Sequence, residues 1–260
     1  MAFSGKTVAS TFKDILQIDN SNAGISTSLK VVKDGAGNQS VLYISDDNIQ
    51  IQPKNDDTTS LVVINDKDGD AKFSIDSTND YVKALGHHVN TNIKEFGMGA
   101  ADNFPTTTDT WTALQSIITG KTDPEVQAGT GITPSTAFTI STTADDMVSR
   151  FWYVPFDITI DSVHAWFGAD AASGDVVKFS LMSYTVDSAN GSTSGDLSSG
   201  VENCKSGATI TGAGYEQAYY QSLTVSTANV DSGKIIMVFV SQNGTNADLT
   251  INMQLVYHLR

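Results

Sequence analysis

Alternation of apolar and polar residues is the feature of this sequence that most limits how the chain can fold. In the C-terminal segment ADLTINMQLVYHL, apolar side chains occupy every second position from Leu249 to Tyr257. Successive side chains of a β-strand point to opposite faces of its sheet, so the segment predicts a half-buried strand. Five segments between Phe151 and Gln242 are also rich in β-branched and aromatic residues. Together they predict an antiparallel β-sandwich over residues 127–260, with a jelly roll as the favoured type.

Residues 1–95 predict a different module, built of short strands and tight turns. The alternating runs between Gly24 and Leu85 are short, and KDGAGN, SDD, KNDDTT and NDKDGD separate them. The clearest hairpin joins SLVVI to AKFSI, with Asp68 and Gly69 supplying the turn. The phrases LQIDNSNAG and FSIDSTNDY each predict a strand that ends where Asp, Asn and Ser bond to the backbone. For the first segment, VASTFKDILQI, a short helix is favoured over a strand.

Residues 96–126 are predicted to connect the two modules through a short helix. Thr108 or Asp109 is placed to cap it, and Gly120 is placed to end it. Its apolar stripe has helical spacing and consists of Trp111, Leu114, Ile117 and Ile118.

The charge balance excludes some classes of partner. The 260 residues carry a formal net charge of -14, so a surface that binds nucleic acid or an anionic membrane is not expected. Only 17% of the residues are charged, against roughly 25% in an average domain. The first ten residues, MAFSGKTVAS, do not match a signal peptide, and no apolar stretch approaches about 18 residues. We therefore expect maturation in a cytoplasm, without membrane insertion.

The sequence offers no pattern typical of an active site. It contains no G-x-S-x-G elbow and no glycine-rich phosphate loop, and its single cysteine, Cys204, lies in no catalytic motif. Glu125, Glu202 and Glu216 do not discriminate a glycosidase in so acidic a chain. We expect a protein that is not an enzyme and needs no cofactor.

Two groups of residues are candidate metal ligands. Asp66, Asp68 and Asp70 alternate like the start of a calcium loop, but Gly69 precedes the third acid and no closing Glu follows, so a plain hairpin turn is favoured. His87 and His88 are adjacent and would point to opposite faces of a strand. They could therefore not bind one ion within one chain, although three copies of one of them could meet on a threefold axis.

Aromatic residues are the better candidates for a contact surface. Phe151, Trp152, Tyr153, Trp166 and Phe167 accompany three tyrosines, Tyr215, Tyr219 and Tyr220. Most of these rings are expected in the sandwich core, but at least one of the three tyrosines is predicted to be exposed where a protein partner or a glycan binds.

Several of these phrases resemble parts of a known family of proteins. Residues 11–59, which include QIDNSNAG and VVKDGAGNQSVLYISDDNIQIQP, and residues 73–97 resemble the proximal module of fibres and other virion appendages of tailed bacteriophages. Residues 158–184, 214–225 and 246–258 are similar to the β-sandwich tips that follow such modules.

The resemblance implies a homotrimer on a virion that is assembled in the host cytoplasm. The N-terminal part would dock to capsid or tail proteins, the sandwich would be held outward, and the stripe of Trp111, Leu114, Ile117 and Ile118 would bundle about the threefold axis. Because 260 residues leave no room for a long shaft, a short fibre or a capsid decoration protein is favoured. The alternatives are a receptor-binding tip that holds a host glycan near Tyr219, Tyr220 and the loop from Val186 to Cys204, and a polysaccharide-cleaving appendage.

Overall fold

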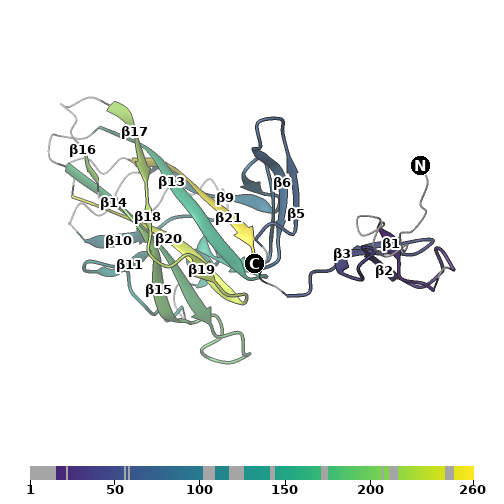
Figure 1. Ribbon diagram of the computed structural model, residues 1–260. Helices are drawn as coiled ribbons and strands as arrows, with labels where there is room; N and C mark the ends of the chain where they lie inside the picture. The colour runs from purple at the N-terminus through teal and green to yellow at the C-terminus, as the bar shows by residue number, and fades with distance from the viewer. Residues whose placement is uncertain are drawn as a thin grey trace, which may run out of the picture. The chain divides into compact units, whose positions relative to one another are not determined.

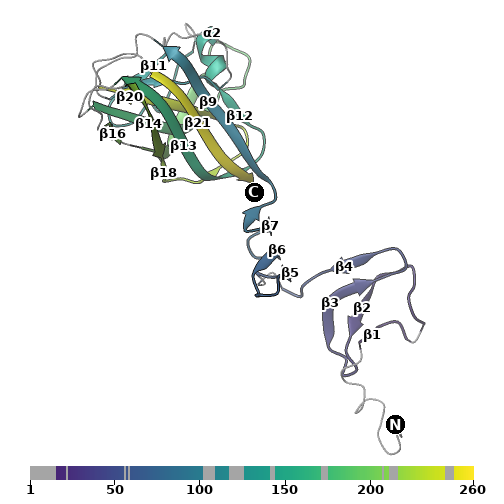
Figure 2. The same cartoon turned by 90° about the horizontal axis from the view of Figure 1, so that it is seen from above.

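The computed structural model of the chain consists almost entirely of antiparallel β-sheets, as Figures 1 and 2 show. It describes residues 16–21, 23–55, 57, 59–101, 109–116, 126–140, 144–170, 175–206, 208–210, 216–243 and 249–260. Helix in these ranges is limited to α2 (Ala144–Met147) and the 3-10 turn Val148–Arg150. Within the same residues, no helix has the length and apolar character needed to cross a membrane. The prediction of a mainly β fold is confirmed.

The chain divides into two compact units, Met1–His87 and His88–Arg260. The first unit contains a four-stranded sheet in which consecutive strands pair. Its strands are β1 (Gln17–Ile18), β2 (Lys30–Lys33), β3 (Gln39–Ile44) and β4 (Ile49–Ile51). The predicted helix is wrong at Gln17 and Ile18, which form β1, and its residues 8–15 lie outside the described residues.

One face of this sheet is largely apolar but only partly buried. Directly paired residues share a face, and the paired positions are Ile18 with Val32, Leu42 with Ile51, and Ile44 with Ile49. Ile49 and Ile51 are nevertheless 75% and 44% exposed.

A second sheet of the first unit has the same property. It consists of β5 (Val62–Asn65), β6 (Ala71–Asp76), β7 (Tyr81–Ala84) and β8 (His87–His88), and the last residue of β8 already belongs to the second unit. Its register places six apolar side chains on one face, namely Val62, Ile64, Phe73, Ile75, Val82 and Ala84. None of the six is buried, and Ile64 is 58% exposed. Neither sheet therefore has a hydrophobic core of its own.

Aspartates that accept backbone hydrogen bonds form the turns of this unit. Asp34 Oδ1 accepts from the amides of Ala36 and Asn38, at 2.9 and 2.8 Å. At the end of β6, Asp76 Oδ1 accepts from the amides of Thr78 and Asn79, both at 2.9 Å. The predicted role of Asp76 as a strand stop in FSIDSTNDY is confirmed.

The second unit is a sandwich whose smaller sheet has five strands. Their path is β17 (Glu216–Ser222), β13 (Ile158–Asp170), β21 (Leu249–Leu259) and β9 (Thr91–Ala101), and β19 (Asn229–Val230) pairs with β13 off this path. Figure 2 shows β13, β21 and β9 side by side. The alternation from Leu249 to Tyr257 behaves as predicted, because Leu249, Ile251, Met253 and Leu255 are all buried.

The larger sheet has eight strands. Its path is β11 (Gln127–Thr130), β10 (Thr110–Ala113), β20 (Lys234–Gln242), β14 (Asp175–Val186), β15 (Leu197–Lys205) and β18 (Thr224–Val225), with β12 (Trp152–Val154) and β16 (Ala208–Ile210) paired off this path. The sandwich is therefore antiparallel and two-sheeted, whereas jelly-roll connectivity stays a prediction.

Two hydrophobic cores stabilise the sandwich. The first lies between the sheets, where side chains of β13 and β21 such as Phe167 and Met253 meet those of β14 and β20 such as Phe179 and Val238. The second covers the opposite face of the larger sheet and is completed by Ile140, Met147 and Phe138.

Hydrogen bonds fix the segment that covers this second core. Phe138 and Leu197 exchange two backbone hydrogen bonds of 2.9 Å, and Tyr184 Oη donates to Ser135 O at 2.8 Å. Because covering elements lie on both sides, the central strands β14 and β20 of the larger sheet are buried on both of their faces.

The predicted connector helix is wrong where the structure describes it. Residues 110–113 form β10, and Trp111 and Leu114 are fully buried in the second and first cores respectively. They cannot form the outward stripe of a helix bundle. Ile117 and Ile118 lie outside the described residues.

The predicted domain boundaries also change. Because β9 and β10 pair with β21 and β20, the sandwich begins at His88 and not at residue 127. Residues 96–126 are thus part of the sandwich wherever they are described, and the first unit ends at residue 87 and not at 95.

Trp111→Ala tests the position of this side chain in the core. Removing the fully buried indole, whose Nε1 donates to Gly131 O at 2.9 Å, should lower the free energy of unfolding by about 3–5 kcal/mol. Urea unfolding followed by circular dichroism measures the change. Trp166→Ala is the matched control, since Trp166 is 53% exposed and should cost much less. Equal costs would contradict the assignment of Trp111 to the core.

The turn aspartates predict acid sensitivity of the first unit. The side-chain hydrogen bonds from Asn38 and Lys72 hold the pKa values of Asp34 and Asp66 below their ordinary value. Burial of Asp76 acts in the opposite direction, but the hydrogen bonds from Asn79, Tyr81 and Thr78 together outweigh it, so the pKa of Asp76 is also lowered. A lowered folded-state pKa stabilises the fold above the unfolded pKa of about 3.9, and this stability is lost as the pH falls through the folded-state value.

We therefore expect the turns of Met1–His87 to open below about pH 4, before the sandwich unfolds. An NMR titration of the amides of Asp70 and Asn79 measures this opening. Asp66→Ala should open its turn even at neutral pH, because Asp66 Oδ1 accepts from the amides of Asp68 and Asp70. Asp68→Ala removes only an exposed carboxylate of the same turn and should leave the amide signals in place. Equal effects of the two variants would show that these hydrogen bonds do not hold the turn.

Candidate functional site

The solvent-facing side of the five-stranded sheet carries an exposed aromatic pair. Trp166 on β13 lies directly opposite Tyr220 on β17, with ring centroids 5.1 Å apart and ring planes inclined by 48°. The two side chains are 53% and 51% exposed. Alternation along β13 explains the exposure, because the neighbours Ala165 and Phe167 point into the core.

A histidine fixes the orientation of the tyrosine in this pair. His164 Nδ1 is 2.8 Å from Tyr220 Oη, and His164 Nε2 is 2.9 Å from Ser162 Oγ. Both ring nitrogens of His164 are therefore engaged with hydroxyl groups. This arrangement holds the Tyr220 ring beside Trp166 on the sheet surface.

Polar side chains extend the same face across β21 and β9. Asn252 lies opposite Trp166 and Gln254 lies opposite His164, and Gln254 Nε2 donates to Glu95 Oε1 at 3.3 Å. We call the set Tyr220, Trp166, His164, Asn252, Gln254 and Glu95 the outer-face surface. Flat rings beside amide and carboxylate groups can bind either a sugar or a protein partner, because rings supply stacking area and the polar groups supply hydrogen bonds.

The three candidate tyrosines have different positions. Tyr220 belongs to the outer-face surface, whereas Tyr219 points to the opposite side of β17 and stacks on Phe167 at 5.4 Å between ring centroids. The buried Tyr219 hydroxyl has no hydrogen-bond partner among the described residues. Tyr215 lies outside the described residues. The prediction that at least one of the three is exposed is confirmed for Tyr220, and its role in an interface stays a prediction.

The loop after Val186 is not part of the outer-face surface. It joins β14 to β15 in the larger sheet, whereas Tyr220 lies in the smaller one. Asp187 organises it by accepting from the amide of Ala189 at 3.0 Å and from Thr193 Oγ1 at 2.6 Å. The strands that flank this loop and the strand that carries Tyr219 and Tyr220 therefore belong to different sheets.

The aspartates between β5 and β6 form a hairpin turn. Besides accepting two backbone hydrogen bonds, Asp66 pairs with Lys72 Nζ at 2.8 Å, and Asp68 pairs with Lys67 Nζ at 2.6 Å. The predicted hairpin is confirmed, and Gly69 occupies its left-handed position with φ of 92°. Across the described residues, the group of histidine, cysteine or acidic side chains whose ligand atoms converge is instead His88, Asp161 and His258.

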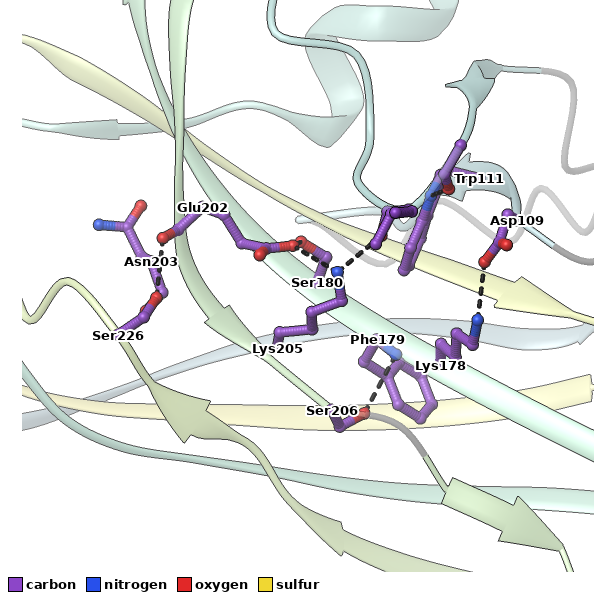
Figure 3. A network of polar contacts seen from close by, with 12 residues as sticks. Asp109, Trp111, Lys178, Phe179, Ser180, Glu202, Asn203, Lys205, Ser206 and Ser226 are labelled. Atoms are coloured by element: carbon purple, nitrogen blue, oxygen red, sulfur yellow. Dashed lines mark hydrogen bonds and ion pairs between the residues drawn. The ribbon is translucent and has the colours of Figure 1, made fainter.

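Two groups that an enzyme could use are engaged in structural contacts. Figure 3 shows Glu202 between Ser180 and Lys205, with Glu202 Oε1 3.1 Å from Ser180 Oγ and 3.4 Å from Lys205 Nζ. The same view shows Lys178 paired with Asp109 at 2.7 Å. Burial, followed by the charge of Glu202, raises the pKa of the Cys204 thiol to about 12, so the reactive thiolate is disfavoured.

Sequence patterns alone did not reveal the most informative residues of these sites. The sequence marks Trp166 as one of several aromatic residues, but whether its side chain points inward depends on the register of β13, and nothing in the sequence pairs His164 with Tyr220. Asp161 and His258 belong to no motif and lie 97 positions apart. The one local signal was the pair His87 and His88.

The chain was also compared with known proteins. Neither a scan against the profiles of known protein families nor a search of curated protein sequences finds a significant match.

Proposed function

We propose that this chain is a non-enzymatic structural protein of a tailed-bacteriophage virion. It would form a short trimeric fibre or a decoration protein, bound to capsid or tail proteins through Met1–His87 and displaying the β-sandwich outward. The observation that carries the assembly part of this proposal is the pair of apolar sheet faces in the first unit, which lack buried cores. The assignment to a virion rests on the sequence resemblance.

Small sheets of this kind are marginal on their own. A sheet of a few short strands needs a packed apolar face for stability, and within the described residues of this unit only two hydrophobic side chains, Val31 and Val32, are buried. Around a threefold axis, three copies of the face formed by Ile64, Phe73 and their neighbours would bury one another. This contact replaces the bundle that the sequence assigned to Trp111 and Leu114.

The sandwich has the opposite character. Its two cores are buried within one chain, so we expect it to fold without a partner. This independence suits a domain that is displayed at the surface of a particle.

Light scattering on the full-length protein and on residues 88–260 tests this assembly. We expect a trimer for the full chain and a monomer for the truncated chain, because the unburied apolar faces lie in the part removed. Ile49→Glu and Ile64→Glu should weaken the trimer, whereas Val201→Glu, at a 45% exposed position of the sandwich, should not. A monomeric full-length protein would refute the proposed assembly, and a trimer of residues 88–260 would place the contact elsewhere.

A second candidate function is the binding of a host glycan, and the Trp166–Tyr220 pair favours it. The two rings and the nearby Asn252 and Gln254 offer the stacking and hydrogen-bonding groups that a sugar requires. A receptor-binding tip would use this surface while the first unit assembles the trimer.

Binding of host-surface polysaccharide to Trp166→Ala and Tyr220→Ala tests this second function. Each variant should bind at least about tenfold more weakly, the loss typical of a central aromatic contact. Tyr153→Ala is the matched control, because Tyr153 is 56% exposed on β12 in the other sheet. Equal binding by all three variants would refute the outer-face surface as the glycan site. Release of sugar ends from the polysaccharide would instead favour a cleaving appendage.

A further inference from the structure

Three side chains from distant parts of the sequence meet at one end of the five-stranded sheet. His88 ends β8 and lies three residues before the start of β9, Asp161 lies in β13, and His258 lies near the end of β21. Strand pairing brings them together, because His258 is opposite Thr91 on β9 and opposite Thr159 on β13. All three residues belong to the unit His88–Arg260.

An irregularity in β13 places Asp161 in this cluster. The register between β13 and β21 shifts between Ile160 and Ser162, so Asp161 is an extra residue in the strand. Such bulges bend a strand and redirect one side chain, and they are frequent beside functional sites. Here the bulge brings the carboxylate of Asp161 next to the imidazole of His258.

The cluster places two imidazole rings and one carboxylate within reach of a shared ion. His258 Nδ1 is 2.9 Å from Asp161 Oδ1 and 3.0 Å from Oδ2. The His88 ring lies parallel to the His258 ring, with centroids 3.8 Å apart and planes inclined by 4°. One ligand atom from each of the three residues lies within 4.8 Å of the other two.

The donor set selects the class of ion. Two imidazole nitrogens and one carboxylate oxygen suit Zn²⁺ and other divalent first-row transition metals, whereas Ca²⁺ and Mg²⁺ prefer oxygen ligands. Zinc bonds of about 2.0–2.2 Å in a tetrahedral arrangement require donors roughly 3–3.5 Å apart, and an imidazole binds a metal in its own ring plane. Binding therefore requires the His88 ring to turn out of its stack on His258. The side chains of His258 and Asp161 are 14% and 31% exposed, so the cluster is partly screened but accessible to an ion.

We propose that His88, Asp161 and His258 bind one divalent transition metal ion, zinc by their donor set. The ion would fasten the first residue of the sandwich to β13 and to its last strand. Because β9 is an edge strand of its sheet, this link would hold its start in register.

Titration of the metal-stripped full-length protein with Co²⁺, which reports tetrahedral coordination by visible absorption, tests the proposal. We expect one Co²⁺ per chain, displaced by Zn²⁺. At a hundredfold excess of free Zn²⁺ over Kd, the Tm of the sandwich should rise by roughly 5–10 °C. Absence of Co²⁺ absorption together with an unchanged Tm would overturn the site.

Three ligand variants and one matched control assign the residues. His88→Ala, Asp161→Asn and His258→Ala should each weaken Co²⁺ binding by more than the roughly 10–100-fold that loss of an outer partner costs. His87→Ala changes the exposed neighbour of His88 and should leave binding unchanged. If circular dichroism shows that His258→Ala does not fold, the conservative Asp161→Asn variant still tests whether the cluster binds the metal. Binding of one Co²⁺ per three chains that is lost in His87→Ala would overturn the proposal in favour of an ion on a threefold axis.

Discussion

The sandwich depends on the burial of β20 on both of its faces. Ile236, Val238 and Val240 point into the core between the sheets, and the alternating residues Ile235, Met237 and Phe239 point into the second core. A strand with one solvated face would need polar residues at half of these positions. The run KIIMVFV contains none after its first residue, so it requires a covering layer on each side, and the segment around Phe138 and Met147 supplies the second one.

The two units of the chain differ in how they satisfy the same physical requirement. The sandwich buries its apolar faces within one chain, whereas the sheets of Met1–His87 gain local order from aspartate-led turns and leave apolar faces partly exposed. Hydrogen-bonded turns fix the path of a chain, but they contribute little of the burial that stabilises a fold. The proposed function follows from this difference: the first unit would assemble the trimer because its apolar faces need partners, and the sandwich would be displayed because its faces are already buried.

Sequence patterns predicted local structure better than they predicted which side chains are buried. The alternation at Leu249–Tyr257, the hairpin at Asp68–Gly69 and the strand end at Asp76 are local signals, and the structure agrees with each of them. The failure at Trp111 and Leu114 has a clear cause, because residues three apart share one face of a helix but point to opposite faces of an extended chain, and here they enter two different cores. The outer-face surface could be predicted only in part. The sequence marked both Tyr219 and Tyr220 as candidates, but only their pairing with Phe167 and Trp166 shows which of the two is exposed. The cluster of His88, Asp161 and His258 could not be predicted, because it depends on strand order and on a bulge.

The isolation of Cys204 has a practical consequence for studying this protein. It is the single thiol of the chain, its side chain is fully buried in the core between the sheets, and burial keeps it protonated. A thiol reagent can therefore modify the native chain only when that core opens, so the rate of modification measures the opening directly. Cysteines introduced at the surface can carry probes with little competition from the native residue. Such probes would report assembly, while the slower modification of Cys204 would report the stability of the core.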